Sequence, residues 1–308
     1  MSRYVLRRLL QMVGTFFGAT LIVYALMFSI ADDPLRALAG EKPLNPSQRA
    51  QLTAQYHLDQ PFLVQYGYYM RGVLTGNLGR TLAGRPIADV LAESWPRTIR
   101  LGLMASLVVT VLGIGGGLLA GLRRGGWFDH GSLAVTLVIV GTPVFVIGTV
   151  FQAVFAVQLG WFRPSYAPEL GLRTYILPAI VLGSLSLATV LRLTRASVAE
   201  NLRADYVRTA NAKGLGRARV VGIHVLRNSL IPVVTYLGTD LGALMSGAIV
   251  TEGIFNIPGV GGRIFQGVRL EDGPLVVTIV SILILVYLVT TLLVDVLYAV
   301  LDPRIRYE

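Results

Sequence analysis

Few residues in this sequence have the types and spacing that enzymatic chemistry requires. The chain has no cysteine, two lysines (Lys42 and Lys213) and three histidines (His57, His130 and His224). A phosphate-binding loop of the form G-x-x-x-x-G-K-[ST] needs glycine before its lysine, whereas glutamate precedes Lys42 and alanine precedes Lys213. Intramembrane hydrolysis needs a nucleophile and base, or metal ligands, buried together, and we expect all three histidines in loops. We therefore expect no ATPase or hydrolase site on this chain.

Two acidic residues, Asp240 and Asp295, interrupt otherwise apolar runs. A charge at the centre of a membrane helix costs about 2.5–3.5 kcal/mol on insertion scales. Asp240 is therefore expected to face a polar pathway or a cationic partner, or to be protonated and bond a neighbouring helix. For Asp295, near the end of its run, we expect a structural hydrogen bond.

The elements that carry these residues are membrane helices. The chain is 54% hydrophobic and 14% charged, against about 45–50% and about 25% in soluble domains. Its mean hydropathy is +0.64, and a membrane span needs about 20 apolar residues. Six runs meet this test: 9–30, 99–122, 132–159, 174–191, 229–251 and 275–300. We predict an all-α polytopic membrane protein with six transmembrane helices.

The first run follows basic residues, as a signal peptide would. Its apolar stretch is longer than the 7–15 residues of a signal-peptide core. We expect a retained first spanning helix and divide the chain into 1–30, an extracytoplasmic loop domain at 31–98, and a five-helix core at 99–308. The loop is rich in proline and contains an amphipathic stretch at 60–74, which we expect to lie partly on the membrane surface.

The arginines predict the orientation. If the N-terminus is cytoplasmic, the inside segments hold 15 basic residues. The short outside loops then hold only Arg163, Arg173, Arg263 and Arg269. Because short cytoplasmic loops are enriched in Lys and Arg, both termini are expected inside. The net charge of +10 is thus explained by membrane topology. We expect the basic residues to lie near lipid headgroups and expect no nucleic acid as a partner.

Two features of the runs concern helix packing. The glycine-rich stretch 113–117 lies inside a spanning run, so we read it as a close helix contact and not as a nucleotide loop. Pro143 lies inside the third run and is expected to kink that helix.

The cytoplasmic loop at about 192–228 is too patterned to be a plain solvated loop. Apolar and then small residues recur at helical spacing: Leu202, Tyr206, Val207, Ala210 and Gly214. A glycine-containing break follows, and then a second amphipathic stretch. The segment 197–200 has capping-box form but fits equally well inside a prolonged fourth helix. We expect a compact knob, in which Ala210 and Gly214 would let a partner backbone approach.

The knob carries the sequence TANAKGL at 209–215. It resembles the coupling motif of ABC-importer permeases, in the form used by the oligopeptide, dipeptide and nickel subgroup. The resemblance extends over nearly the whole chain, through RRLL (7–10), DP (33–34), HLDQP (57–61), GNLG (76–79), RNSLIP (227–232), EGIFNIPGVG (252–261) and LDPRIRY (301–307). One departure is Arg227 where the general motif has proline, a form usual for the peptide subgroup.

This resemblance implies a mechanism in which ATP-driven closure of partner ATPases moves the spanning helices. The residues that it assigns to coupling are Tyr206, Thr209, Ala210, Ala212, Lys213, Gly214 and Leu215. It makes Asp240 a candidate pathway residue, and it makes Glu252, Phe255 and Pro258 candidates for an outer gate or a binding-protein contact.

The resemblance also implies partners and cargo. The partners are a second, homologous permease subunit in a heterodimer, two ATPase subunits or domains that use ATP and Mg, and an extracytoplasmic substrate-binding protein. Peptides are the leading cargo, with nickel chelates, haem and glycans as alternatives. A stand-alone channel or secondary transporter would leave the structured loop unexplained.

Overall fold

The computed structural model describes residues 2–28, 45–47, 50, 53–54, 57–246 and 248–301. Within these ranges the chain forms helices and turns, and the β-type pairing is confined to one isolated bridge between Arg80 and Pro86. Most of the segment 31–56 lies outside the described residues. The predicted all-α class is confirmed.

The chain contains enough long apolar helices for five or six membrane spans. Five helices pass by length and composition: Arg7–Met27, Ile87–Leu122, Pro168–Asn201, Arg217–Leu244 and Gly273–Leu292. A sixth span exists if the bent pair Trp127–Gly141 and Val144–Gln158 counts as one. Three helices extend well beyond the expected runs: the second begins at Ile87, the fourth ends at Asn201 and the fifth begins at Arg217. The segment 197–200 therefore lies inside the prolonged fourth helix.

The chain divides into two compact units. Unit 1 comprises Met1–Thr98 and Pro258–Glu308, and unit 2 comprises Ile99–Ile257. Unit 1 contains α1 (Ser2–Phe28), α4 (Phe62–Thr75), the start of α5 (Ile87–Val108), α14 (Val260–Arg269) and α15 (Gly273–Leu301). Unit 2 contains the rest of α5, α6 (Ile114–Leu122), α7 (Trp127–Gly141), α8 (Val144–Phe151), α9 (Ile176–Asn201), α10 (Asp205–Ala212), α11 (Arg217–Arg219), α12 (Leu226–Ser246) and α13 (Ala248–Ile254).

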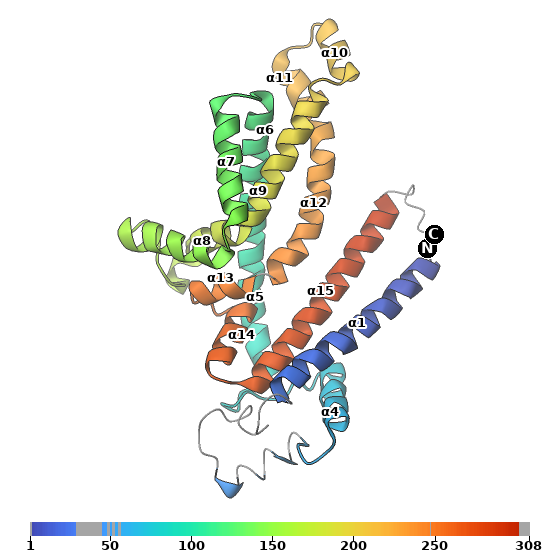
Figure 1. Cartoon of the computed structure of the whole chain (residues 1–308), viewed down its shortest axis with the longest axis vertical. Coiled ribbons are helices and arrows are strands. Elements are labelled where there is room, and N and C mark those ends of the chain that lie inside the picture. The colour runs from blue at the N-terminus through green and yellow to red at the C-terminus, as the bar shows by residue number, and fades with distance from the viewer. Residues whose placement is uncertain are drawn as a thin grey trace. The chain divides into compact units, whose positions relative to one another are not determined.

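In unit 1, α1 and α15 run side by side (Figure 1). The buried Tyr24 of α1 packs against Val277 of α15 and against aromatic rings of α4. The Tyr69 hydroxyl on α4 donates to Ser281 Oγ at 2.8 Å. Helices distant in sequence thus share one small aromatic core. Asp295 lies in α15, but its side chain is outside the described part.

In unit 2, α6 packs closely on α9 through glycines. A Cβ on Gly117 would lie 2.6 Å from the Leu191 carbonyl oxygen, and one on Gly121 would lie 2.8 Å from Val198. Only glycine allows the backbones to approach this closely. The close helix contact predicted from the glycine-rich stretch is confirmed.

Pro143 breaks the third run more sharply than a kink. It has no N–H to continue the helix and disfavours helical backbone at the preceding residue, and Thr142 is extended (φ −110°, ψ 128°). The helices on either side, α7 and α8 with its continuation, meet at 111°.

The contacts of this bent pair indicate that it carries the chain from one end of unit 2 to the other. Near the start of α7, Asp129 pairs with Arg195, close to the end of α9. On α8, a Cβ on Gly148 would touch Val181, near the start of α9, and Ile254. These contacts lie toward opposite ends of α9, so the bent pair is the candidate for the sixth predicted span.

Candidate functional site

The predicted coupling segment forms the tip of unit 2 at one end (Figure 1). Helix α10 (Asp205–Ala212) is anchored by its inward face, where Val207 and Ala210 are buried. They pack with Val198, Val220 and Val225, with Leu215 partly buried beside them. Ala210 was expected to admit a partner backbone, but its side chain is only 4% exposed and faces its own chain. The apolar stripe thus attaches the knob to the spanning helices.

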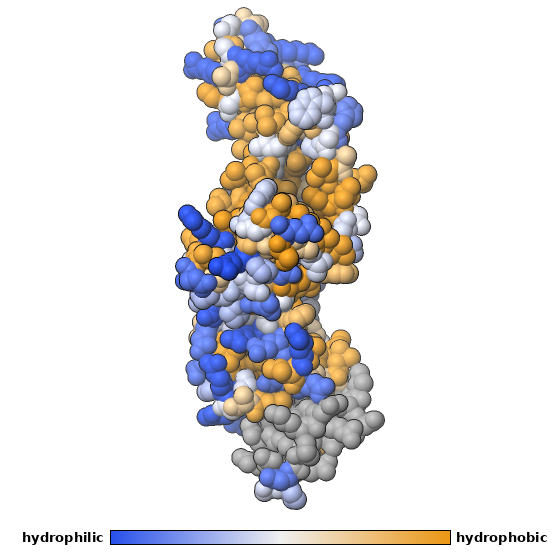
Figure 2. Space-filling model, turned by 90° about the vertical axis from the view of Figure 1, so that its left-hand side faces the viewer, coloured by the Kyte–Doolittle hydropathy of each residue, from blue (hydrophilic) through white to orange (hydrophobic). Residues whose placement is uncertain are grey.

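The opposite face of the knob is exposed. It carries Tyr206, Thr209, Ala212, Lys213 and Gly214. Gly214 has φ +73°, a left-handed conformation that ends the helix and that side chains with a Cβ disfavour. Figure 2 shows hydrophilic residues gathered at this end of unit 2 and a hydrophobic surface over the adjoining helices. Five of the seven candidate coupling residues are therefore open to a partner.

A buried ion pair holds the basic end of unit 2 together. The Arg195 guanidinium on α9 donates to both carboxylate oxygens of Asp129 on α7, through Nε to Oδ1 and through a second nitrogen to Oδ2 at 2.8 Å. The Asp129 side chain is 2% exposed, and its Oδ2 also accepts the Gly125 N–H at 2.9 Å. The sequence interpretation missed this pair. The available signal was an acidic residue directly after the Arg123–Arg124 turn.

Asp240 lies on α12, and its side chain bonds to α9. Its side chain is 9% exposed, and its Oδ1 accepts the Ser186 hydroxyl at 2.8 Å. Its Oδ2 is buried, with no hydrogen-bond partner among the described residues. Of the alternatives for Asp240, a bond to a neighbouring helix is therefore present, and one oxygen remains for a further partner.

The three outer candidates do not lie together at a surface. Glu252 is fully buried and Phe255 is 1% exposed within the core of unit 2, so neither side chain forms a docking surface in this structure. Pro258 begins the second segment of unit 1 and is half-buried. Its carbonyl oxygen accepts Arg97 Nη1 at 3.3 Å.

Positive charge surrounds the Pro258 turn of unit 1. Burial, then the like charges of Arg97 and Arg85, lower the pKa of the Arg263 guanidinium, while Glu93 opposes them. Glu93 already pairs with Arg85 at 2.8 Å. The turn is therefore rich in arginine and has little compensating acid among the described residues.

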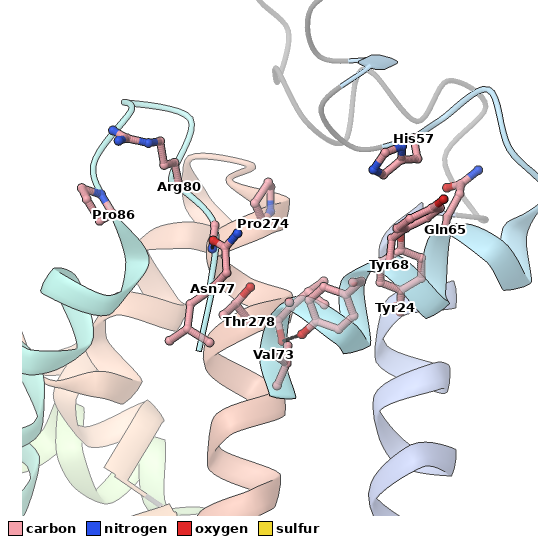
Figure 3. Close-up of a pocket in the computed structure, with 15 residues that line it drawn as sticks. Tyr24, His57, Gln65, Tyr68, Val73, Asn77, Arg80, Pro86, Pro274 and Thr278 are labelled. Carbon is pink, nitrogen blue, oxygen red and sulfur yellow. Dashed lines mark hydrogen bonds between the residues drawn. The ribbon is translucent and has the colours of Figure 1, made fainter. Parts of the chain in front are cut away.

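Unit 1 also contains a cavity of about 540 Å³, drawn in Figure 3. Tyr24, Tyr68, Asn77 and Thr278 line it from α1, α4, the following turn and α15. Two of the polar side chains in the cavity bond within the protein: Asn77 Oδ1 accepts the Gly79 N–H, and Gln65 donates to the Gln60 carbonyl oxygen. The His57 ring stacks on Tyr68 with centroids 4.0 Å apart.

His130 and His224 do not belong to a metal site among the described residues. His130 lies in α7 and His224 in the π-helical turn Val220–Val225, so the expectation that both lie in loops was wrong. Among the described residues, no group of three or more His, Cys, Asp or Glu side chains could hold a metal ion.

Two family models match this chain. Residues 113–307 match the binding-protein-dependent transport system inner membrane component. Residues 1–101 match the N-terminal region of the membrane component of such systems. Together the two matches span both structural units.

Individual relatives match over their full length. The di/tripeptide transport system permease protein DppB of Pseudomonas aeruginosa (strain UCBPP-PA14) is 37% identical over 335 residues, with all of both chains covered. The dipeptide transport system permease protein DppB of Escherichia coli (strain K12) is 36% identical over 340 residues, again with full coverage. The glutathione transport system permease protein GsiC of the same strain is 35% identical over 310 residues and equally covered.

Proposed function

The chain belongs to the family of inner-membrane components of binding-protein-dependent transport systems, the permeases of ABC importers, and we propose that it forms half of a peptide translocation pathway. Its place is in the dipeptide and oligopeptide subgroup of that family. It is a multi-pass protein of the inner membrane. The other half of the pathway would be a second, homologous permease chain.

The exposed face of α10 is the observation that carries this proposal. Thr209 and Ala212 lie on α10, and Lys213 and Gly214 follow it directly; all four are exposed. The other face of this short helix packs against α9 and against Val220 and Val225. Because the inward face is packed, a displacement of α10 is passed to α9 and α12 and is not absorbed by a loose loop. A partner ATPase that moves α10 would therefore move the spanning helices.

The chemistry of ATP hydrolysis belongs, in this proposal, to two partner ATPase subunits or domains. Neither Lys42 nor Lys213 can complete a phosphate-binding loop. ATP and Mg are therefore used by the partners. We assign no cofactor to this chain and no enzymatic step to its residues. An extracytoplasmic substrate-binding protein delivers the cargo.

Peptides are the proposed cargo because the full-length relatives include permeases named for dipeptides, di/tripeptides and glutathione. Nickel chelates, haem and glycans are the alternatives within the same machinery. A stand-alone channel or secondary transporter is less well supported, since neither requires the anchored knob.

For topology we propose that both termini and α10 face the cytoplasm. The turn that holds Arg123 and Arg124 and the basic end of α9 lie at the same end of unit 2, joined by the Asp129–Arg195 pair. Residues 31–98 would then form the extracytoplasmic loop domain, and residues 99–308 the permease core.

We propose that Asp240 lies along the translocation pathway. Its Oδ2 is available to a cargo amino group or to an arginine of the partner permease. For the outer gate or binding-protein contact, the exposed part of the Pro258 turn is favoured over the buried side chains of Glu252 and Phe255.

The decisive experiment enlarges α10 without straining this chain. Ala212 is exposed, so Ala212→Phe fits the isolated permease but not a close partner surface. In the reconstituted complex, we expect peptide uptake and coupled ATP hydrolysis to fall more than roughly tenfold, the effect of about 1.4 kcal/mol. Gly214 is less suitable, because any side chain at φ +73° strains the backbone.

The matched control is Ala83→Phe, at an exposed alanine in the turn before α5, which should keep normal uptake. If ATP hydrolysis stayed fully coupled to peptide uptake in Ala212→Phe, α10 would not be the contact with the partner ATPase. A cargo panel of dipeptides, longer peptides, nickel chelates, haem and oligosaccharides then tests the substrate class in the same complex.

A further inference from the structure

A second cavity opens at the basic end of unit 2. Its volume is about 380 Å³, and it lies between the turn after α6 and the last turns of α9. Its charged lining is three arginines and one acid: Arg124, Arg195, Arg203 and Glu200. Because Asp129 pairs with Arg195, the charges around the cavity sum to plus one, which favours an anionic occupant.

One of these arginines is held in a fixed position. Arg195 binds Asp129 through two of its nitrogens, and its side chain is only 20% exposed. A guanidinium fixed in this way loses little side-chain entropy when it binds a further anion. It therefore provides a pre-positioned donor at the base of the cavity.

The other two arginines are available. Arg124 and Arg203 are exposed, and their guanidinium groups form no ion pair with any residue in the described ranges. They come from different elements, the α6–α7 turn and the segment after α9. A ligand between them would be contacted from two sides.

The surroundings of the cavity are those of a membrane interface. Trp127, which follows closely after Arg124, is 85% exposed, and Leu119 on α6 is 53% exposed. Tryptophan is enriched where the hydrocarbon core meets the headgroups. Exposed apolar side chains beside basic residues place the cavity within reach of a lipid headgroup.

We propose that Arg124, Arg195 and Arg203 bind the phosphate of an anionic phospholipid. Basic pockets between membrane helices bind lipid headgroups in this manner. The net positive charge favours a headgroup without an ammonium group, as in phosphatidylglycerol, whose hydroxyl groups can donate hydrogen bonds to the Glu200 carboxylate. The lipid would bridge the α6–α7 turn to the end of α9, next to the knob that carries α10.

The test measures lipid binding to the complete transporter by native mass spectrometry. The complex is titrated with phosphatidylglycerol, phosphatidylethanolamine and phosphatidylcholine of the same acyl chains. In Arg124→Gln/Arg203→Gln we expect phosphatidylglycerol affinity to fall roughly fivefold per charge removed, or about 25-fold in total. The control, Arg173→Gln, removes an exposed arginine in the 3₁₀ segment Pro168–Tyr175 and should bind as the wild type does.

Five results would overturn the proposal. The double variant could bind phosphatidylglycerol normally, or Arg173→Gln could lose as much affinity. Phosphatidylethanolamine or phosphatidylcholine could bind the wild type as tightly as phosphatidylglycerol. Inorganic phosphate at equal concentration could displace the lipid, which would indicate a site for a soluble anion. The double variant could keep its lipid and lose the ATPase, which would indicate a protein contact.

Discussion

Asp240 has one bonded and one unbonded carboxylate oxygen inside unit 2. Ser186 satisfies Oδ1 at 2.8 Å, and Oδ2 is buried without a partner among the described residues. Such a group is costly unless something binds it during function. This arrangement allows a purely structural role to be separated from a transport role.

We expect Asp240→Asn to lower uptake roughly tenfold, because a charge-assisted hydrogen bond of about 1.5 kcal/mol to a cation is lost. Uptake and thermal unfolding of the reconstituted complex are measured together. Ser186→Ala is the control, since it removes the interhelical bond but keeps the charge, and its uptake should change less. Equal loss of stability in both variants with unchanged uptake would leave Asp240 a structural residue.

At the level of residues, the sequence showed which positions form an apolar face, but not which neighbour that face packs against. The periodicity of residues 202–214 correctly indicated an apolar face, yet the partner of that face could not be read from spacing. Val207 and Ala210 turn toward their own chain because Val198 and Val220 cover them. The Asp129–Arg195 pair joins residues 66 positions apart, and such a contact exists only once α7 and α9 have packed.

At the level of elements, the close approach of α6 to α9 depends on glycine at Gly117 and Gly121. A Cβ on Gly117 would lie 2.5 Å from Thr194 Cβ, whereas one on Gly115 would meet nothing within 4 Å. Gly117→Ala should destabilise the protein by about 1–3 kcal/mol through overpacking. Gly115→Ala should be neutral or stabilising, since alanine favours helix by about 1 kcal/mol. Thermal unfolding in detergent tests the pair, and equal midpoints would contradict the close packing.

The Asp129–Arg195 pair gives a second prediction for elements. Asp129→Asn removes the charge that compensates a largely buried guanidinium, and such a loss costs about 3 kcal/mol. The unfolding midpoint should fall clearly. Asp205→Asn is the control, because its pair with Arg208 is exposed on both sides and exposed pairs contribute little. If the two variants behaved alike, the buried pair would not hold α7 to α9.

Element boundaries show which physical signals a sequence carries. Hydropathy located the spans because apolar length is a local property, and Pro143 indicated the interruption of the third run. The 111° angle could not be derived, since it depends on the contacts of Gly148 with Val181 and Ile254. The second helix begins at Ile87 and runs through charged residues and Pro96 before its apolar run. Hydropathy therefore placed its start too late.

For the whole molecule, the absence of cysteine permits a direct test of topology. Single-cysteine variants Ser2→Cys, Arg208→Cys and Arg163→Cys can be labelled with a membrane-impermeant maleimide. We expect label at position 163 in intact cells, and at positions 2 and 208 only after the membrane is opened. Label at 208 in intact cells would reverse the proposed orientation.

The grouping of helices was beyond sequence reasoning. Helix α15 shares unit 1 with α1 and α4, although α15 and α1 lie at opposite ends of the chain. Tyr24, Tyr69 and Val277 carry no local signal of this association. Loop closure over such a distance is decided by tertiary packing and not by propensity.

The break at Pro143 also sets how thick a bilayer the protein can accept. Helix α7 has 15 residues, so it extends only about 22 Å along its axis, against about 30 Å of hydrocarbon. Beyond Thr142 the chain turns aside into α8. Because α7 alone is shorter than the hydrocarbon layer, we expect the bilayer beside it to become locally thinner, which is one way in which membranes accommodate hydrophobic mismatch.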